Sequence, residues 1–71
     1  MYSYVIGNKE KTKFLRYDRV QRMRVAVEDV AYADTFDDAE AYNIITTNMY
    51  TEFFMENNLT EVYKVSHAIV L

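Results

Sequence analysis

The longest periodic run of apolar residues lies between Thr35 and Asn58 and predicts one substantial helix. Spacings of three, four and four residues place its apolar side chains on one stripe of a 3.6-residue helix. The stripe consists of Tyr42, Ile45, Met49 and Phe53. Because no other segment has a comparable pattern, we expect this stripe to be buried against a layer built from the flanking segments.

The ends of this helix carry local signals. Asp37, followed three residues later by Glu40, matches a capping box. The Asn pair at 57–58 favours a stop, because Asn tolerates the left-handed conformation found just past helix ends. The Thr pair at 46–47 is the weakest point, but its cost of about 0.7 kcal/mol or less per residue should not break the helix.

Two runs that precede the helix predict a hairpin. Tyr2–Ile6 and Thr12–Tyr17 are rich in aromatic and β-branched residues, and Gly7 with Asn8 supplies a turn signal between them. A two-residue loop would leave Phe14 on the face of Val5, whereas a five-residue loop over 7–11 would set Tyr4 opposite Phe14. We favour the five-residue loop because it gathers the apolar residues on one face. Those residues are Tyr2, Tyr4, Ile6 and Phe14.

Three further segments complete the predicted layer. The alternating run Arg22–Val27 suits a third strand, with a turn of helix as the alternative. Val30–Phe36 is either a short strand or an extended approach to the helix. Glu61–Leu71 is predicted to be the last strand, inside or beside the hairpin, with His67 on the face of Tyr63.

These elements define a single α+β domain over residues 1–71. We expect a small antiparallel sheet of three or four strands with one amphipathic helix packed on a face, in the order ββ(β)αβ. A domain of this size buries only about 60% of the surface of its unfolded chain, so its stability should be modest.

The amino-acid composition indicates a folded protein and the kind of cellular compartment in which it works. Apolar residues make up 51% of the chain, and seven Tyr with four Phe give enough material for a core. The absence of Cys removes disulfide and thiolate chemistry and fits a reducing compartment. No apolar run approaches the length of a membrane span and no signal-peptide pattern occurs. We therefore expect a cytoplasmic protein without a membrane partner.

The net charge of −3 conceals a strong asymmetry along the chain. Residues 1–24 hold seven cations and two carboxylates, a net charge of +5, whereas residues 25–71 hold one cation and nine carboxylates, a net charge of −8. Whether the two halves form separate surfaces depends on the fold.

Residues capable of chemistry do not form a recognisable motif. His67, the only histidine, lies on an otherwise apolar strand face, which is typical of a partly buried structural residue. The acids at 34–40 lack the Gly and the spacing of a calcium loop, and a single Gly cannot build a phosphate-binding loop. We therefore expect no enzyme activity, no metal and no cofactor.

An acidic face with tyrosine anchors is the first candidate for partner binding. Such a face could occupy a basic groove on another protein, including a groove built for nucleic acid. The residues of this predicted face are Glu28, Asp29, Asp34, Asp37, Asp38, Glu40, Tyr32 and Tyr50.

Two other surfaces remain as alternatives. Cations among aromatic residues in the basic half could neutralise phosphates while bases stack on the rings. The residues of this nucleic-acid face are Lys9, Lys11, Lys13, Arg16, Arg19, Arg22 and Arg24. A homodimer could also form through the apolar C-terminal edge that ends in Leu71.

Three segments together define the layout of the chain: YVI at 4–6 as a first strand, VEDVAYADTFDDAEAY at 27–42 as an approach and acidic helix start, and EVYKV at 61–65 as a last strand. In this layout the chain resembles a loose class of very small phage-encoded proteins of bacteria. Characterised members of that class are often inhibitors that bind host defence or replication proteins, anti-CRISPR proteins among them. The resemblance implies an inhibitor that binds a host protein, and it carries no catalytic residue. The basic run Arg16–Arg24 and the helix half ITTNMYTEFF depart from that layout.

Overall fold

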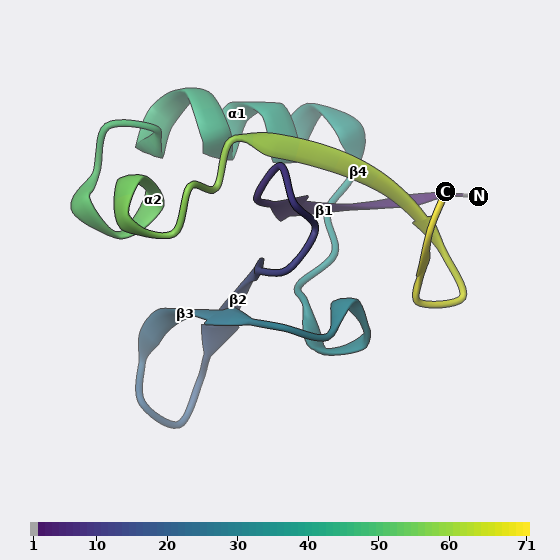
Figure 1. Ribbon diagram of the computed structural model, residues 1–71, viewed down its shortest axis with the longest axis horizontal. Coiled ribbons are helices and arrows are strands. Elements are labelled where there is room, and N and C mark those ends of the chain that lie inside the picture. Colours follow the sequence, from purple (N-terminus) through teal and green to yellow (C-terminus); the bar gives the residue numbers. More distant parts are fainter. Residues whose placement is uncertain (1) are drawn as a thin grey trace.

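The computed structural model describes residues 2–71 and contains five strands, two α-helices and one short 3-10 helix. In chain order they are β1 (Ser3–Gly7), β2 (Phe14–Asp18), β3 (Met23–Val27), η1 (Val30–Tyr32), α1 (Asp38–Asn48), α2 (Glu52–Glu56), β4 (Glu61–Ser66) and β5 (Ile69–Val70). The strands form one antiparallel sheet in the order β3-β2-β1-β4-β5, with α1 across one face (Figure 1). The α+β class and the third strand are confirmed, but five strands replace the expected three or four.

The additional strand comes from the C-terminal segment, where one continuous strand over Glu61–Leu71 is wrong. His67 and Ala68 both have positive φ, 52° and 62°, and they turn the chain so that Ser66 pairs with Ile69. Positive φ at both central residues is the geometry of a type I′ hairpin turn. His67 is therefore exposed at a turn. The prediction that it is partly buried on a strand face is wrong.

A buried side chain sets the length of the β1–β2 loop. The side-chain oxygen of Asn8 accepts hydrogen bonds from the backbone N–H groups of Thr12 (2.8 Å) and Lys13 (3.0 Å). Asn8 is only 6% exposed, so these bonds satisfy a polar group that would otherwise be costly to bury. They hold six residues between the strands, and the favoured five-residue loop is wrong.

This loop places Gly7 directly opposite Phe14. Phe14 consequently lies with Val5 and Val65 on one face of the sheet, and not with Tyr4 and Ile6 as predicted. A Cβ atom on Gly7 would lie 2.8 Å from Cδ1 of Phe14 and 2.9 Å from the carbonyl oxygen of Lys13. The only glycine of the chain thus gives the Phe14 ring its space.

The segment that precedes α1 fills the gap between β1 and β2. Phe36 exchanges two backbone hydrogen bonds with Tyr4 of β1, at 2.9 and 2.8 Å. Asp34 donates its backbone N–H to the carbonyl of Leu15 in β2 (3.0 Å), and its carboxylate accepts the N–H of Tyr17 (2.8 Å). The segment expected to be a strand or an extended approach is thus a short 3-10 helix followed by a single β-bridge.

The predicted start of the helix is confirmed, whereas its predicted length is wrong. The backbone N–H of Glu40 donates to Asp37 Oδ1 at 2.7 Å, and the N–H of Asp37 donates to Glu40 Oε1 at 3.1 Å. The helix ends after Asn48, because Thr51 directs both its backbone N–H (2.9 Å) and its hydroxyl (2.6 Å) to the Asn48 carbonyl. The chain then resumes as α2.

The predicted buried stripe is correct only in part. Ile45 is buried, but the side chains of Tyr42 and Met49 are 56% and 40% exposed. The buried side of α1 is formed by Ala41 and Ile45, and α2 contributes Phe54, which is 1% exposed. Phe53 is half-buried and packs against the same core. The predicted stripe was out of phase within α1 itself, where Ala41 and not Tyr42 shares the buried side with Ile45.

Each face of the sheet has its own core. The core between the sheet and the helices contains Ile6, Leu15, Ala41, Ile45, Phe54 and Leu59. The core on the opposite face contains Val5, Phe14 and Val65, with Val30 of η1 and Val70 of β5 packed against it. The β2–β3 hairpin extends from this double-faced centre on the side away from α1 (Figure 1).

Candidate functional site

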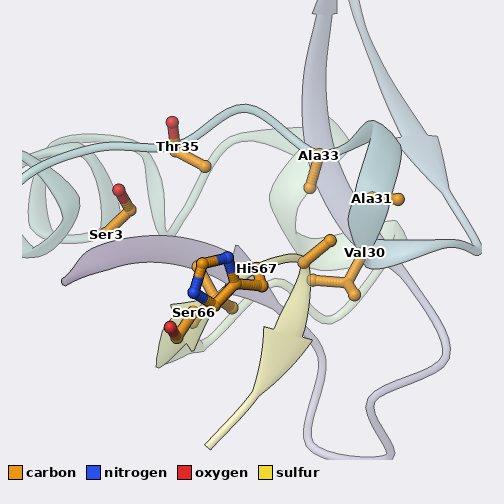
Figure 2. Close-up of a pocket in the computed structure, with 9 residues that line it drawn as sticks. Ser3, Val30, Ala31, Ala33, Thr35, Ser66 and His67 are labelled. Atoms are coloured by element: carbon orange, nitrogen blue, oxygen red, sulfur yellow. The ribbon is translucent and has the colours of Figure 1, made fainter.

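The residues that could take part in acid–base or nucleophilic chemistry do not converge. His67 borders a cavity of about 250 Å³ together with Ser3, Thr35 and Ser66. Figure 2 shows the hydroxyl groups of Ser3 and Thr35 directed away from the His67 ring. A nucleophile and its base must lie within hydrogen-bond reach of one another. Within residues 2–71 no three His, Cys, Asp or Glu side chains are grouped to hold a metal ion.

Most carboxylates of the predicted acidic face hold backbone N–H groups. Asp29 accepts the N–H of Ala31 at the start of η1 (2.9 Å), and Asp34 accepts that of Tyr17 (2.8 Å). Asp37 and Glu40 form the capping box of α1. These four side chains position elements of the fold, so only Glu28 and Asp38 of the set are not used in this way among the residues described.

The predicted acidic face is also spread over three places. Glu28, Asp29 and Tyr32 lie at η1, the acids 37–40 lie at the N-terminus of α1, and Tyr50 follows its C-terminus. An 11-residue helix is about 16 Å long, which separates Tyr50 from those acids by the length of α1. The anticipated set is therefore not one contiguous patch.

A different set of side chains lies along the two helices and was missed in the sequence. Tyr42, Met49, Tyr50 and Met55 are 56%, 40%, 83% and 58% exposed. Asp38, Tyr42 and Met49 fall on one side of α1 at helical spacing. We call the following residues the helical surface: Asp38, Tyr42, Met49, Tyr50, Glu52 and Met55.

The helical surface lies in a part of the chain that contains no cation. Residues 25–63 include no Lys or Arg but nine carboxylates, a feature that was readable from the sequence. Arg24 alone reaches this layer from β3, where its Nη1 donates to Asn48 Oδ1 at 2.9 Å and its guanidinium carbon lies 5.5 Å from the centroid of the Phe54 ring. The helical segment 37–58 itself holds five carboxylates and no cation, so its charge is negative.

The predicted nucleic-acid face divides into lysines that precede β2 and arginines that begin in the middle of β2 and continue into β3. Lys9, Lys11 and Lys13 lie in the β1–β2 loop, where the Nζ atom of Lys11 is 5.3 Å from the centroid of the Tyr63 ring. The four arginines, Arg16, Arg19, Arg22 and Arg24, all belong to the β2–β3 hairpin. A ligand that met all seven cations would have to extend from the β1–β2 loop to the tip of the β2–β3 hairpin.

Hydrogen bonds to the side chain of Asp18 stabilise the tip of the β2–β3 hairpin. Asp18 Oδ1 accepts the backbone N–H groups of Val20 (2.9 Å) and Gln21 (3.1 Å), and Arg22 takes a positive φ of 55°. Val20 is 93% exposed at this tip. Arg19 and Arg22 are exposed on either side of it.

A groove of about 360 Å³ runs between the hairpin and η1. Arg16, Arg19 and Tyr32 line it, and Arg16 Nη1 donates to the carbonyl oxygen of Tyr32 at 2.9 Å. Tyr32, which the sequence had suggested as an anchor among acids, therefore borders two arginines. The contact joins residues 16 positions apart, and no local pattern in the sequence signals it.

The C-terminal edge, predicted as a route to a homodimer, is short. β5 has two residues, and Ile69 within it and Leu71 just after it are each 63% exposed. The N–H of Leu71 is already bonded to the carbonyl of Lys64 in β4, at 2.9 Å. Short edge strands offer few unpaired backbone groups to another chain.

Across residues 2–71, neither helix has the length and the apolar character needed to cross a bilayer. Searches with the whole chain found no matching protein family, no matching curated protein and no matching solved structure.

Proposed function

We propose that the protein is a small acidic protein-binding module that acts by blocking a basic, nucleic-acid-binding site on a host protein, as phage-type inhibitors do. One observation carries this proposal. The helical surface exposes large apolar side chains along the helical segment 37–58, which holds five carboxylates and no Lys or Arg. Exposed apolar groups within a polar surround are typical of protein interaction sites.

The exposed side chains are of the kinds that anchor interfaces. Tyr50 offers a large contact area with a polar tip and few rotatable bonds, and it is 83% exposed. Met49 and Met55 are flexible and polarizable, so they can adapt to an irregular partner surface. Burying such groups supplies most of the affinity in interfaces where a few residues dominate.

The charge of the helical surface favours a basic partner. Asp38 and Glu52 lie within the set, and uniformly negative potential speeds encounter with positive surfaces and disfavours acidic ones. A site built to bind nucleic acid has the complementary sign. Occupation of that site would then exclude the nucleic acid by direct overlap.

The proposal is tested with two matched double variants. Tyr50→Ser with Met55→Ser removes anchors from the helical surface, and Tyr2→Ser with Ile69→Ser removes two other exposed apolar residues elsewhere, 54% and 63% exposed. Each protein is immobilised, a bacterial lysate is passed over it, and the captured partner is purified. We expect a basic partner that binds the native chain and the Tyr2/Ile69 variant, but not the Tyr50/Met55 variant.

Competition then tests the mode of action. The captured protein is titrated with its nucleic-acid ligand in the presence of the native chain, and we expect the two to exclude one another. Equal capture by both double variants, or simultaneous binding of nucleic acid and this protein to the partner, would contradict the proposal.

A further inference from the structure

The β2–β3 hairpin concentrates positive charge in an otherwise acidic molecule. Residues 14–27 hold four arginines and one aspartate, a net charge of +3. The remaining residues hold four lysines and ten carboxylates, a net charge of −6. Figure 1 shows the hairpin extending away from α1, although Arg24 of β3 bonds to Asn48 of α1 and Asp34 bonds to Tyr17 of β2. An anion is therefore attracted to the hairpin and repelled by the helical side.

The two acids beside the groove are committed to the backbone. Asp18 accepts two N–H groups in the hairpin turn, and Asp34 accepts the N–H of Tyr17. Arg16 and Arg19, in contrast, direct no hydrogen bond to a carboxylate among the contacts of residues 2–71. Both aspartates keep their negative charge, so the excess positive charge around the groove comes from Arg22 and Arg24, while Arg16 and Arg19 present guanidinium groups along the groove itself.

An aromatic residue, Tyr32, lines the groove beside these cations, and its backbone is held in place. Tyr32 is 63% exposed, and its carbonyl accepts the hydrogen bond from Arg16 at 2.9 Å. Asp29 caps η1, and the N–H of Tyr32 bonds to the Asp29 carbonyl at 3.0 Å. The backbone that carries the ring and the guanidinium beside it are therefore held relative to one another before any ligand arrives.

We propose that this groove binds single-stranded nucleic acid. Tyr32 stacks on one base, and Arg16 and Arg19 neutralise the neighbouring phosphates, with Arg22 at the tip adding a third cation. Stacking needs an exposed base face, which a single strand has and an intact duplex lacks. A groove of about 360 Å³ also receives a nucleotide unit rather than the width of a duplex. This inference does not depend on the helical surface.

The test measures binding of labelled oligonucleotides of about ten residues by fluorescence anisotropy. Oligothymidylate, oligouridylate and a duplex of the same length are compared between 50 and 200 mM salt. We expect both single strands to bind more tightly than the duplex. Three phosphate contacts predict a slope of about −2 in a plot of log K against log salt concentration, since each contributes about 0.7 in single strands.

Four variants separate stacking from charge. Tyr32→Ala should weaken binding about 5- to 100-fold without changing the salt slope, since one stacked base is lost. Arg19→Gln should weaken binding and reduce the slope by about 0.7. Tyr50→Ala and Lys64→Gln make the same kinds of change away from the groove and should leave binding as in the native chain. Circular dichroism checks that each variant is folded.

Three results would overturn the inference. The first is no binding of either single strand at 50 mM salt, and the second is binding of the duplex as tightly as the single strands. The third is native-like binding by folded Tyr32→Ala, even where Arg19→Gln binds weakly, because that pattern indicates charge attraction alone. Failure of the helical-surface variants to affect partner capture would leave this inference standing, so the two proposals fail separately.

Discussion

The phenol hydroxyl of Tyr63 in β4 donates a hydrogen bond to the backbone carbonyl oxygen of Asn8 at 2.7 Å, across 55 positions of the chain. This hydrogen bond links the β1–β2 loop to β4, the strand on the other side of β1. The Asn8 side chain closes the same loop from within through Thr12 and Lys13. One loop is therefore held by both a local and a long-range contact.

Loss of this contact should lower stability by a predictable amount. Tyr63→Phe removes the hydroxyl alone and should reduce the free energy of unfolding by about 1 kcal/mol, the net value of one hydrogen bond. Urea denaturation followed by circular dichroism measures the change. Tyr2→Phe removes a hydroxyl from a tyrosine that is 54% exposed and should leave the midpoint unaltered. Equal midpoints for native protein and Tyr63→Phe would show that the bond contributes nothing.

The same hydroxyl should make stability fall at alkaline pH. Burial, and secondarily the carboxylates of Glu61 and Glu10, raise the pKa of Tyr63 above its ordinary value of 10.0. A pKa that is higher in the folded state means that the folded chain retains the proton more strongly. The associated stability is fully present below pH 10.0 and is lost as pH rises through the higher folded pKa. Denaturant midpoints across this range should decline more for native protein than for Tyr63→Phe, and parallel curves would refute the assignment.

Gly7→Ala should lower the free energy of unfolding, because there is no room for a Cβ atom at this position. The new Cβ would meet Phe14 Cδ1 at 2.8 Å and the Lys13 carbonyl oxygen at 2.9 Å, so strands β1 and β2 must shift. Overpacking of this kind costs about 1–3 kcal/mol. Combining Gly7→Ala with Phe14→Leu removes the ring contact but not the backbone contact, and the pair should be less destabilised than the sum of the single variants. Additive losses in urea denaturation would argue against a direct clash.

Ala68→Gly should stabilise the protein. Ala68 has a φ of 62°, a conformation that costs an L-residue about 1–2 kcal/mol and costs glycine little. Each kcal/mol corresponds to about 4–8 °C in Tm for a domain of this size. The same substitution at exposed Ala39 in α1 should lower Tm, because glycine weakens a helix. Differential scanning calorimetry gives both shifts, and a decrease in Tm for both variants would contradict the argument.

Features that depend on residues close in sequence could be predicted. The capping box of Asp37 and Glu40 needs only a spacing of three, and the alternation over Arg22–Val27 identifies β3. The β4–β5 turn could not, since its His-Ala pair is not one of the Asn-Gly or Asp-Gly pairs that mark such turns. The limitation of β1–β2 pairing to one registered pair could not either, because Tyr4 of β1 is bridged instead to Phe36, a long-range contact.

The candidate surfaces likewise combine features that are visible in the sequence with contacts that appear only in the folded chain. The lack of Lys and Arg over residues 25–63 is plain in the sequence, and so is the concentration of arginine over 16–24. The engagement of Asp34 with Tyr17, and of Arg16 with Tyr32, appears only when η1 lies against β2. Those contacts determine which charged side chains remain free for a partner. Because Tyr32 is surrounded by acids in the sequence, it was assigned to the acidic face, whereas in the fold it lies beside Arg16 and Arg19.

The single registered pair between β1 and β2, Gly7 with Phe14, has a consequence for amide hydrogen exchange. β1 shares five registered pairs with β4, and β2 shares five with β3, so each pair of strands is a cooperative unit with one ladder step between them. Local opening follows such boundaries. Amides of the β2–β3 unit should therefore exchange with deuterium sooner than those of β1 and β4, through a partial unfolding that withdraws Leu15 from the core under the helices.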